Sequence, residues 1–149
     1  MKSDIRTIDL NNLDINNLDL PKEKFTCYVL CDNTLANIDL LEKIIQCEVK
    51  DINACGKYAF LWEECADNIC IEYKNNGKKL NHWCITTENT KLDSFILELA
   101  FEHCEYYDDE AISHNPILLF YDDENLKNFV IKRVEWLLED TTSHDPQKS

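Results

Sequence analysis

The sequence predicts a single α/β domain, because a short apolar run followed by an amphipathic helical stretch recurs four times along the chain. Four such units in series favour a mainly parallel, four-stranded sheet with helices on both faces, a three-layer α/β/α sandwich. With 149 residues, the chain has the length of one ordinary domain. We expect residues 23–140 to form this domain, after an N-terminal arm over 1–22 and before a disordered tail over 141–149.

The first unit begins with FTCYVLC at residues 25–31, which is apolar on both faces and therefore predicts a central strand. Asp32, Asn33 and Thr34 follow and can cap a helix over residues 35–49. Its apolar stripe consists of Leu35, Ile38, Leu41, Ile45 and Val49. The second unit is expected to place a strand at residues 57–62, KYAFLW, before a helix that begins at Glu63 and ends before Gly77.

The third and fourth units follow the same pattern. HWCIT at residues 82–86 predicts a strand, and a helix after Asn89 or Thr90 has a regular apolar face made of Leu92, Phe95, Ile96, Leu99 and Ala100. An acidic and aromatic connection then leads to a strand at 117–121, ILLFY. Asp122 and Asp123 are expected to cap the last helix, with an apolar stripe from Leu126 to Leu138.

Two further features concern topology. A strand order such as 2-1-3-4 would place the first strand centrally, in a Rossmann-like or flavodoxin-like arrangement. The chain has only two glycines, Gly56 and Gly77, and neither is expected between a strand and the following helix. No nucleotide-binding loop is therefore expected.

The N-terminal arm contains a short repeat. Residues 8–22 read IDLNN, LDINN and LDLPK, which resembles pentapeptide-repeat sequence. Three units are too few to close one coil of the β-helix that such proteins form. We therefore expect an arm rich in turns that is disordered, laid against the domain or docked on a partner.

Acidic residues gather where the predicted strands end, and ligands of parallel sheets bind beyond these carboxyl ends. They are Asp32 after the first strand, Glu63 and Glu64 after Trp62, Glu88 after the third strand, and Asp122 and Asp123 after the fourth. One interpretation is helix capping. The alternative is a Mg²⁺-dependent hydrolase or phosphotransfer domain that uses Asp32, Glu63, Glu88 and Asp122.

The eight cysteines form no CxxC pair, and most lie in apolar patterns that suggest core packing. Zinc binding through His82, Cys84, His103 and Cys104 is a weaker alternative. We expect no cofactor. The N-terminus lacks the apolar segment of a secretion signal, and no apolar run is long enough to span a membrane, which favours the cytoplasm.

From Phe25 to Leu138, the order of motifs resembles a group of small uncharacterised bacterial α/β domains. These motifs are a strand ending in Asp32, YAFLW running into a Glu-and-Cys helix start, W-x-I-T-T with Glu88, and a LILLF-like fourth strand. The resemblance implies an α/β fold and a bacterial origin, and it implies no activity.

The formal net charge of −14 disfavours binding to nucleic acids and anionic membranes, and it favours a basic protein partner. We therefore expect a non-catalytic binding module, either immunity-like or a component of a bacterial toxin or defence system. No motif defines the oligomeric state. The residues expected to contact the partner are acidic or aromatic: Asp32, Trp62, Glu63, Glu64, Glu88, Tyr106, Tyr107, Asp108, Asp109, Glu110, Asp122 and Asp123.

Overall fold

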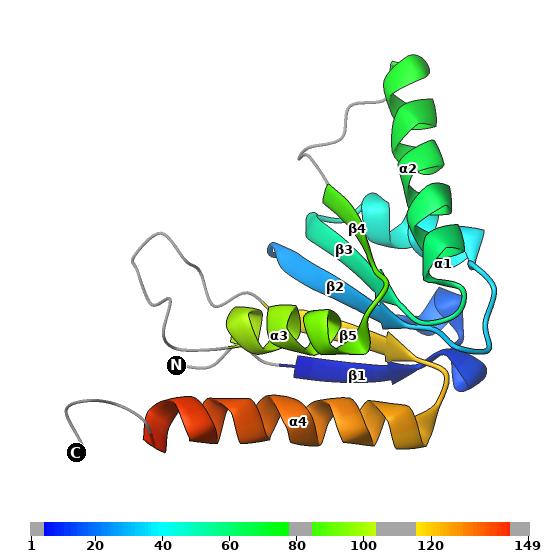
Figure 1. Ribbon diagram of the computed structural model, residues 1–149. Helices are drawn as coiled ribbons and strands as arrows, with labels where there is room; N and C mark the ends of the chain where they lie inside the picture. Colours follow the sequence, from blue (N-terminus) through cyan, green and yellow to red (C-terminus); the bar gives the residue numbers. More distant parts are fainter. Residues whose placement is uncertain (1–4, 78–84, 104–115, 144–149) are drawn as a thin grey trace.

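The computed structural model describes residues 5–77, 85–103 and 116–143, in which five strands form one parallel sheet (Figure 1). The order across the sheet is β1-β5-β2-β3-β4, and every neighbouring pair is parallel. The strands are β1 (Ile5–Asp9), β2 (Phe25–Leu30), β3 (Val49–Cys55), β4 (Ile85–Asn89) and β5 (Ile117–Tyr121). Their carboxyl ends therefore lie at one edge, which we call the carboxyl edge.

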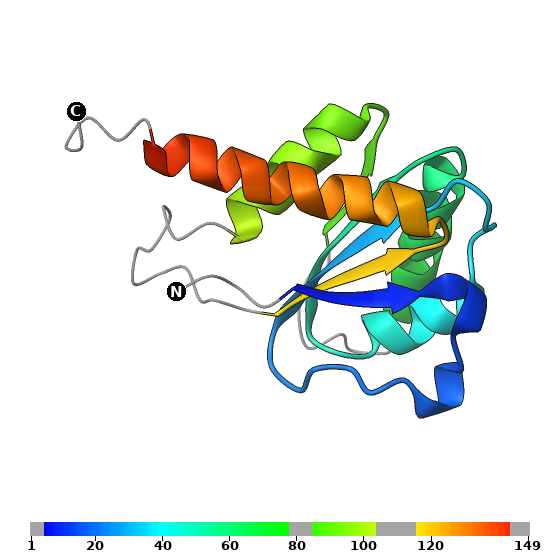
Figure 2. The same ribbon diagram turned by 90° about the horizontal axis from the view of Figure 1, so that it is seen from below.

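Two pairs of helices cover opposite faces of the sheet (Figures 1 and 2). Helices α1 (Ile38–Ile45) and α2 (Ala59–Asn75) pack on one face, and α3 (Leu92–His103) and α4 (Glu124–Ser143) pack on the other. The side chains of β2 alternate between the two cores: Cys27 and Val29 face α1 and α2, whereas Tyr28 and Leu30 face the other pair. Every residue of β2 is buried, as expected for a central strand.

Several predictions from the sequence are confirmed. The fold is α/β with a parallel sheet, and β2 is its central strand. Strand β5 occupies 117–121 as expected. The predicted apolar face of α3 is buried at Phe95, Ile96, Leu99 and Ala100. None of the helices in the described part of the chain has the length and hydropathy of a membrane-spanning helix.

The predicted number of strands is wrong, because the described residues form five strands rather than four. Residues 57–62 are not a strand: KYAFLW leads into α2, which begins at Ala59 and buries Trp62 completely. The second strand of the main domain is instead β3, whose first residue, Val49, was expected in the apolar stripe of the first helix. A short apolar run fits a buried helix as well as a strand, and here the run belongs to a 17-residue helix.

The first helix is also shorter than predicted. It covers only Ile38–Ile45 and is capped by Asn37, whose side chain accepts a hydrogen bond from the Leu40 N–H at 3.1 Å. Leu35 and Ile38, expected in its buried stripe, are exposed, and Val49 belongs to β3. The predicted order 2-1-3-4 is wrong as well, since β5 pairs directly with β2.

The N-terminal arm joins the sheet through β1, which pairs with β5 in register from Ile5↔Ile117 to Asp9↔Tyr121. The first two repeats each form a single 3₁₀ turn, η1 (Leu10–Asn12) and η2 (Ile15–Asn17). In each, an Asp side chain accepts from the backbone N–H two residues later and from an Asn side chain three residues later. The D-x-N-N repeat is therefore a self-capping turn.

The apolar members of the repeats pack on the core beside α1, among them Leu10, Leu13, Ile15 and Leu18. Lys43 of α1 donates to the backbone oxygens of Ile15 and Leu18, at 2.6 Å each. The arm thus connects β1 to β2 with 3₁₀ turns in place of a helix. Residues 78–84, 104–115 and 144–149, which include parts of the predicted third strand and of the tail, lie outside the described residues.

Candidate functional site

The candidate site lies at the carboxyl edge between β2 and β5. From β2 the chain passes to α1 on one face, and from β5 it passes to α4 on the opposite face. Loops that leave neighbouring parallel strands in opposite directions create the usual ligand position of an open α/β sheet. Asp32, Asp122 and Asp123, all expected in the site, follow these two strands directly.

Asp122 holds the chain that leaves β2. Its side chain is 6% exposed, and its two carboxylate oxygens accept from the backbone N–H groups of Asp32 at 3.1 Å and Asn33 at 2.8 Å. The expectation that it caps α4 is therefore wrong, because its carboxylate is directed to the neighbouring loop. Hydrogen bonds to a charged acceptor are stronger than neutral ones, so Asp122 fixes the start of the segment after β2.

Asp32 connects this segment to β3. Its Oδ1 accepts from the backbone N–H of Lys57 at 3.0 Å. Gly56 makes this approach possible: its φ is +115°, and a Cβ there would lie 2.6 Å from the Cys31 carbonyl oxygen and 2.7 Å from Asp32 Oδ1. Only glycine fits such a contact without displacement of the backbone.

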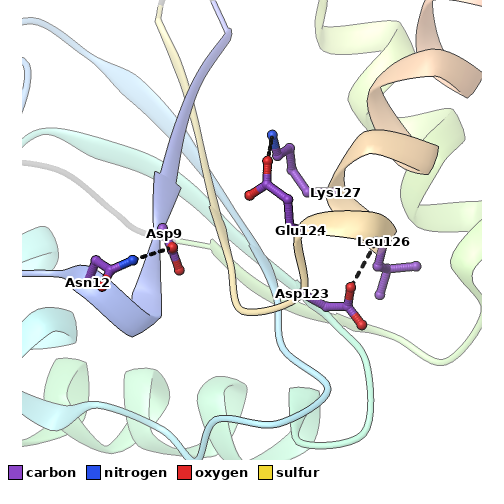
Figure 3. A network of polar contacts seen from close by, with 6 residues as sticks. All are labelled: Asp9, Asn12, Asp123, Glu124, Leu126 and Lys127. Atoms are coloured by element: carbon purple, nitrogen blue, oxygen red, sulfur yellow. Dashed lines mark hydrogen bonds and ion pairs between the residues drawn. The ribbon is translucent and has the colours of Figure 1, made fainter.

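Asp123 is the cap of α4, as predicted, since its Oδ1 accepts from the Leu126 N–H at 3.1 Å (Figure 3). Asp9, at the end of β1, accepts from Asn12 in the same region (Figure 3). Glu124 pairs with Lys127 at 2.9 Å, and this pairing holds the Glu124 pKa below its usual value. The carboxylates of this edge therefore have hydrogen-bonding or ionic partners within the chain.

The next part of the chain, which we call the 33–39 segment, surrounds an open hollow of about 730 Å³. Leu35 is 61% exposed and Ile38 is 55% exposed, and Asp39 lies beside them in the first turn of α1. The buried Trp62 stabilises the segment, because its indole N–H donates to the Thr34 backbone oxygen at 3.2 Å. Trp62, expected to contact a partner, is thus a packing residue.

Leu35 and Ile38 were expected to be buried but are surface residues. Their spacing matches an amphipathic helix, which favoured burial. Asn37 was the available signal, because Asn is a preferred N-cap and places the start of the helix after Leu35.

The other predicted acidic residues lie on α2 and β4. Glu63 is partly buried, and Glu64 and Glu88 are exposed. Burial raises the pKa of Glu63, and the nearby carboxylates of Asp67 and Glu88 raise it further. Asp67 also accepts a hydrogen bond from Thr86 of β4. The four residues of the Mg²⁺ hypothesis therefore interact in two pairs, Asp32 with Asp122 and Glu63 with Glu88, and β3 separates β2 from β4.

In the described part of the chain, no group of three or more His, Cys, Asp or Glu side chains is arranged to hold a metal ion. Of the proposed zinc ligands, only His103 is described, at the end of α3. His82, Cys84 and Cys104 lie outside the described residues, as do the expected contact residues Tyr106, Tyr107, Asp108, Asp109 and Glu110.

A third acidic group, which the sequence did not suggest, lies between α3 and the sheet. Asp51 of β3 and Glu102 of α3 are partly buried, and Glu98 accepts from Asn89 of β4 at 3.2 Å. Burial raises the pKa of Glu102, with Lys50 opposing the effect and Asp51 and Glu98 adding to it. Burial also raises the pKa of Asp51. The positive charge of Lys50 lowers this pKa, and the negative charge of Glu98 raises it further. We call Asp51, Glu98 and Glu102 the α3 acidic group.

Two cysteines lie at strand ends near the carboxyl edge. Burial raises the pKa of Cys55 to about 11. Burial also raises the pKa of the Cys31 thiol, and the Asp122 carboxylate adds to this effect. At neutral pH both thiols are protonated and pack as small apolar side chains.

Comparisons of the chain with protein-family models, with curated proteins and with solved structures found no match. The function is therefore inferred from the geometry of the carboxyl edge.

Proposed function

We propose that this chain is a non-catalytic, acidic protein-binding module that engages a basic protein through the 33–39 segment. The observation that carries the proposal is an exposed apolar pair, Leu35 and Ile38, on a segment whose start is fixed by a buried carboxylate. Apolar anchors with a charged rim suit a protein interface, because the anchors supply affinity and the charges accelerate association.

Pre-organisation supports the same proposal. Three hydrogen bonds hold the segment and the residue before it: Asn33 N–H to Asp122, Lys57 N–H to Asp32, and the Trp62 indole N–H to the Thr34 oxygen. Little conformational entropy is therefore lost when a partner binds. The negative charge of the chain favours a cationic partner at this surface. The same charge disfavours nucleic acids and anionic membranes as partners.

An immunity-like role in a bacterial toxin or defence system fits this chemistry, since such a protein presents carboxylates to a cationic site. The bacterial origin and the cytoplasmic location remain predictions from the sequence. We also propose that the fold is a three-layer sandwich of Rossmann-like or flavodoxin-like class, supported by the packing of two helices on each face.

Co-purification with tagged protein in native cells tests the proposal. We expect a basic protein in stoichiometric amount, with less recovered as salt increases because charges contribute to binding. The double substitution Leu35→Ser and Ile38→Ser should weaken the purified complex roughly tenfold or more, since truncated anchor residues dominate interface energies.

Ile71→Ser is the matched control, because Ile71 is equally exposed but lies in the last turns of α2. It should leave the complex intact. Failure to recover a basic partner in repeated experiments, or equal loss in both variants, would contradict the proposal.

A further inference from the structure

We infer that the first N-terminal repeat controls the order of the 33–39 segment, with Asp122 as the positioning residue between them. The inference rests on the proposed function, because it concerns the regulation of the same surface. Its structural basis is a continuous path of hydrogen bonds across three segments that are distant in the sequence.

The path begins at Asn11, whose side-chain Nδ2 donates to the backbone oxygen of Asp122 at 2.9 Å. The carboxylate of the same Asp122 accepts from the backbone N–H groups of Asp32 and Asn33. Asp122 therefore accepts a hydrogen bond from the arm at its backbone oxygen, and its side chain accepts hydrogen bonds from the start of the 33–39 segment.

Asn11 is itself held in position. The Asp9 carboxylate accepts from the Asn11 N–H at 2.9 Å and from Asn12 Nδ2 at 2.8 Å. Asp9 is in register with Tyr121, the residue before Asp122. The capped turn of the first repeat thus aims Asn11 at the end of β5.

The arm also has the features of a segment that can detach locally. Strand β1 lies at the edge of the sheet with Arg6 and Thr7 exposed, whereas all residues of its neighbour β5 are buried. The apolar residues of the first two repeats are only partly buried. Segments with shallow burial open at a lower free energy than the core does.

Coupling between the arm and the segment acts in both directions. If a docked arm orders the 33–39 segment, a partner bound to the segment must stabilise the docked arm by the same factor. The self-capping repeat therefore provides a means to regulate access to the proposed interface.

Amide hydrogen exchange on the full-length chain tests the inference without any partner. Asn11→Ala should speed exchange at the Asp32 and Asn33 amides roughly two- to fivefold, as expected for loss of one hydrogen bond behind them. Asn16→Ala is the matched control, because Asn16 holds the same position in the second repeat. It should leave both amides unchanged.

Two further measurements define the outcome. Asp122→Ala should speed exchange at the same amides more than Asn11→Ala does, and the Val29 amide of central β2 should stay protected in Asn11→Ala, which shows that the chain remains folded. If Asn11→Ala exchanges like the wild type at Asp32 and Asn33 while Asp122→Ala does not, the coupling is absent. If Asn11→Ala speeds exchange at these amides as expected but co-purification recovers no basic partner, only the proposed function is contradicted.

Discussion

Carboxylates at the carboxyl edge and carboxylates beneath α3 have opposite energetic roles. At the carboxyl edge, Asp32, Asp122 and Asp123 each accept a backbone N–H that would otherwise lack a partner. In the α3 acidic group, Asp51 and Glu102 are partly buried near each other, and burial and repulsion raise their pKa values. The same residue types therefore stabilise one region and destabilise the other at neutral pH.

An acidic composition alone therefore does not locate a site. Hydrogen-bonded carboxylates at the carboxyl edge determine the shape of the 33–39 segment, and exposed apolar residues on that segment provide the contact surface. Substitutions in each region test whether its carboxylates stabilise or destabilise the fold.

The largest effect is expected for Gly56→Ala. A Cβ at position 56 would meet the Cys31 carbonyl oxygen at 2.6 Å, and the φ of +115° is unfavourable for alanine. The free energy of unfolding should fall by roughly 4 kcal/mol, from backbone strain and overpacking together. Urea denaturation measures this change.

Gly77→Ala is the control for Gly56→Ala. Gly77 also has a positive φ, +70°, but a Cβ there meets nothing within 4 Å. It should lose only about 1 kcal/mol. Equal losses at the two glycines would show that close packing at the carboxyl edge contributes nothing.

Asp122→Ala should have the next largest effect. It leaves the Asp32 and Asn33 amides without their acceptor in a partly buried position. We expect the free energy of unfolding to fall by about 2–3 kcal/mol, because hydrogen bonds to charged groups are among the strongest. Asp122→Asn keeps one acceptor oxygen and should lose about half as much; a loss as small as that of an exposed carboxylate would refute this role.

The smallest effect is expected for Glu102→Gln, and its sign is opposite. A pKa raised in the folded state gives stability that is fully present below the unfolded pKa, about 4.3, and lost as the pH rises through the folded pKa. Glutamine does not ionise, so the variant should be more stable than the wild type at pH 7, on the order of 0.5 kcal/mol.

This advantage of Glu102→Gln should shrink as the pH falls through the unfolded pKa of about 4.3, because Glu102 then becomes protonated in both states. Denaturation curves over this pH range provide the measurement. Glu72→Gln, at an exposed position of α2, controls for the loss of one negative charge. A constant or inverted difference would rule out a destabilising role of the α3 acidic group.

Strand β2 and helix α3 could be predicted because each of their apolar patterns fits only one kind of secondary structure. Strand β2 is apolar on both faces, and α3 has a regular helical stripe. Strand β3 could not be found in the same way, because Lys50, Asp51 and Asn53 interrupt its apolar residues. Asn53 is buried and interacts with Thr87 of β4, a contact that only the tertiary structure creates.

The position of the site could be predicted from the sequence, but the contacts of its side chains could not. Asp32, Asp122 and Asp123 follow β2 and β5 as expected, since strand ends can be identified from composition. The partners of their carboxylates could not be identified, because Asp122 contacts residues that lie about ninety positions earlier in the chain. Strand β1 was missed because an edge strand buries only part of each side chain and its repeat favours turns.

The sheet order also constrains how the chain folds during synthesis. Strand β5 lies between β1 and β2, so β1 gains its neighbour in the described sheet only after β5, more than one hundred residues later, has been synthesised. A nascent chain that stops before Ile117 leaves one side of β2 unpaired and the arm without its strand partner. Insertion of β5 between β1 and β2 therefore joins segments that are distant in the sequence, and pairing over such a separation is slow.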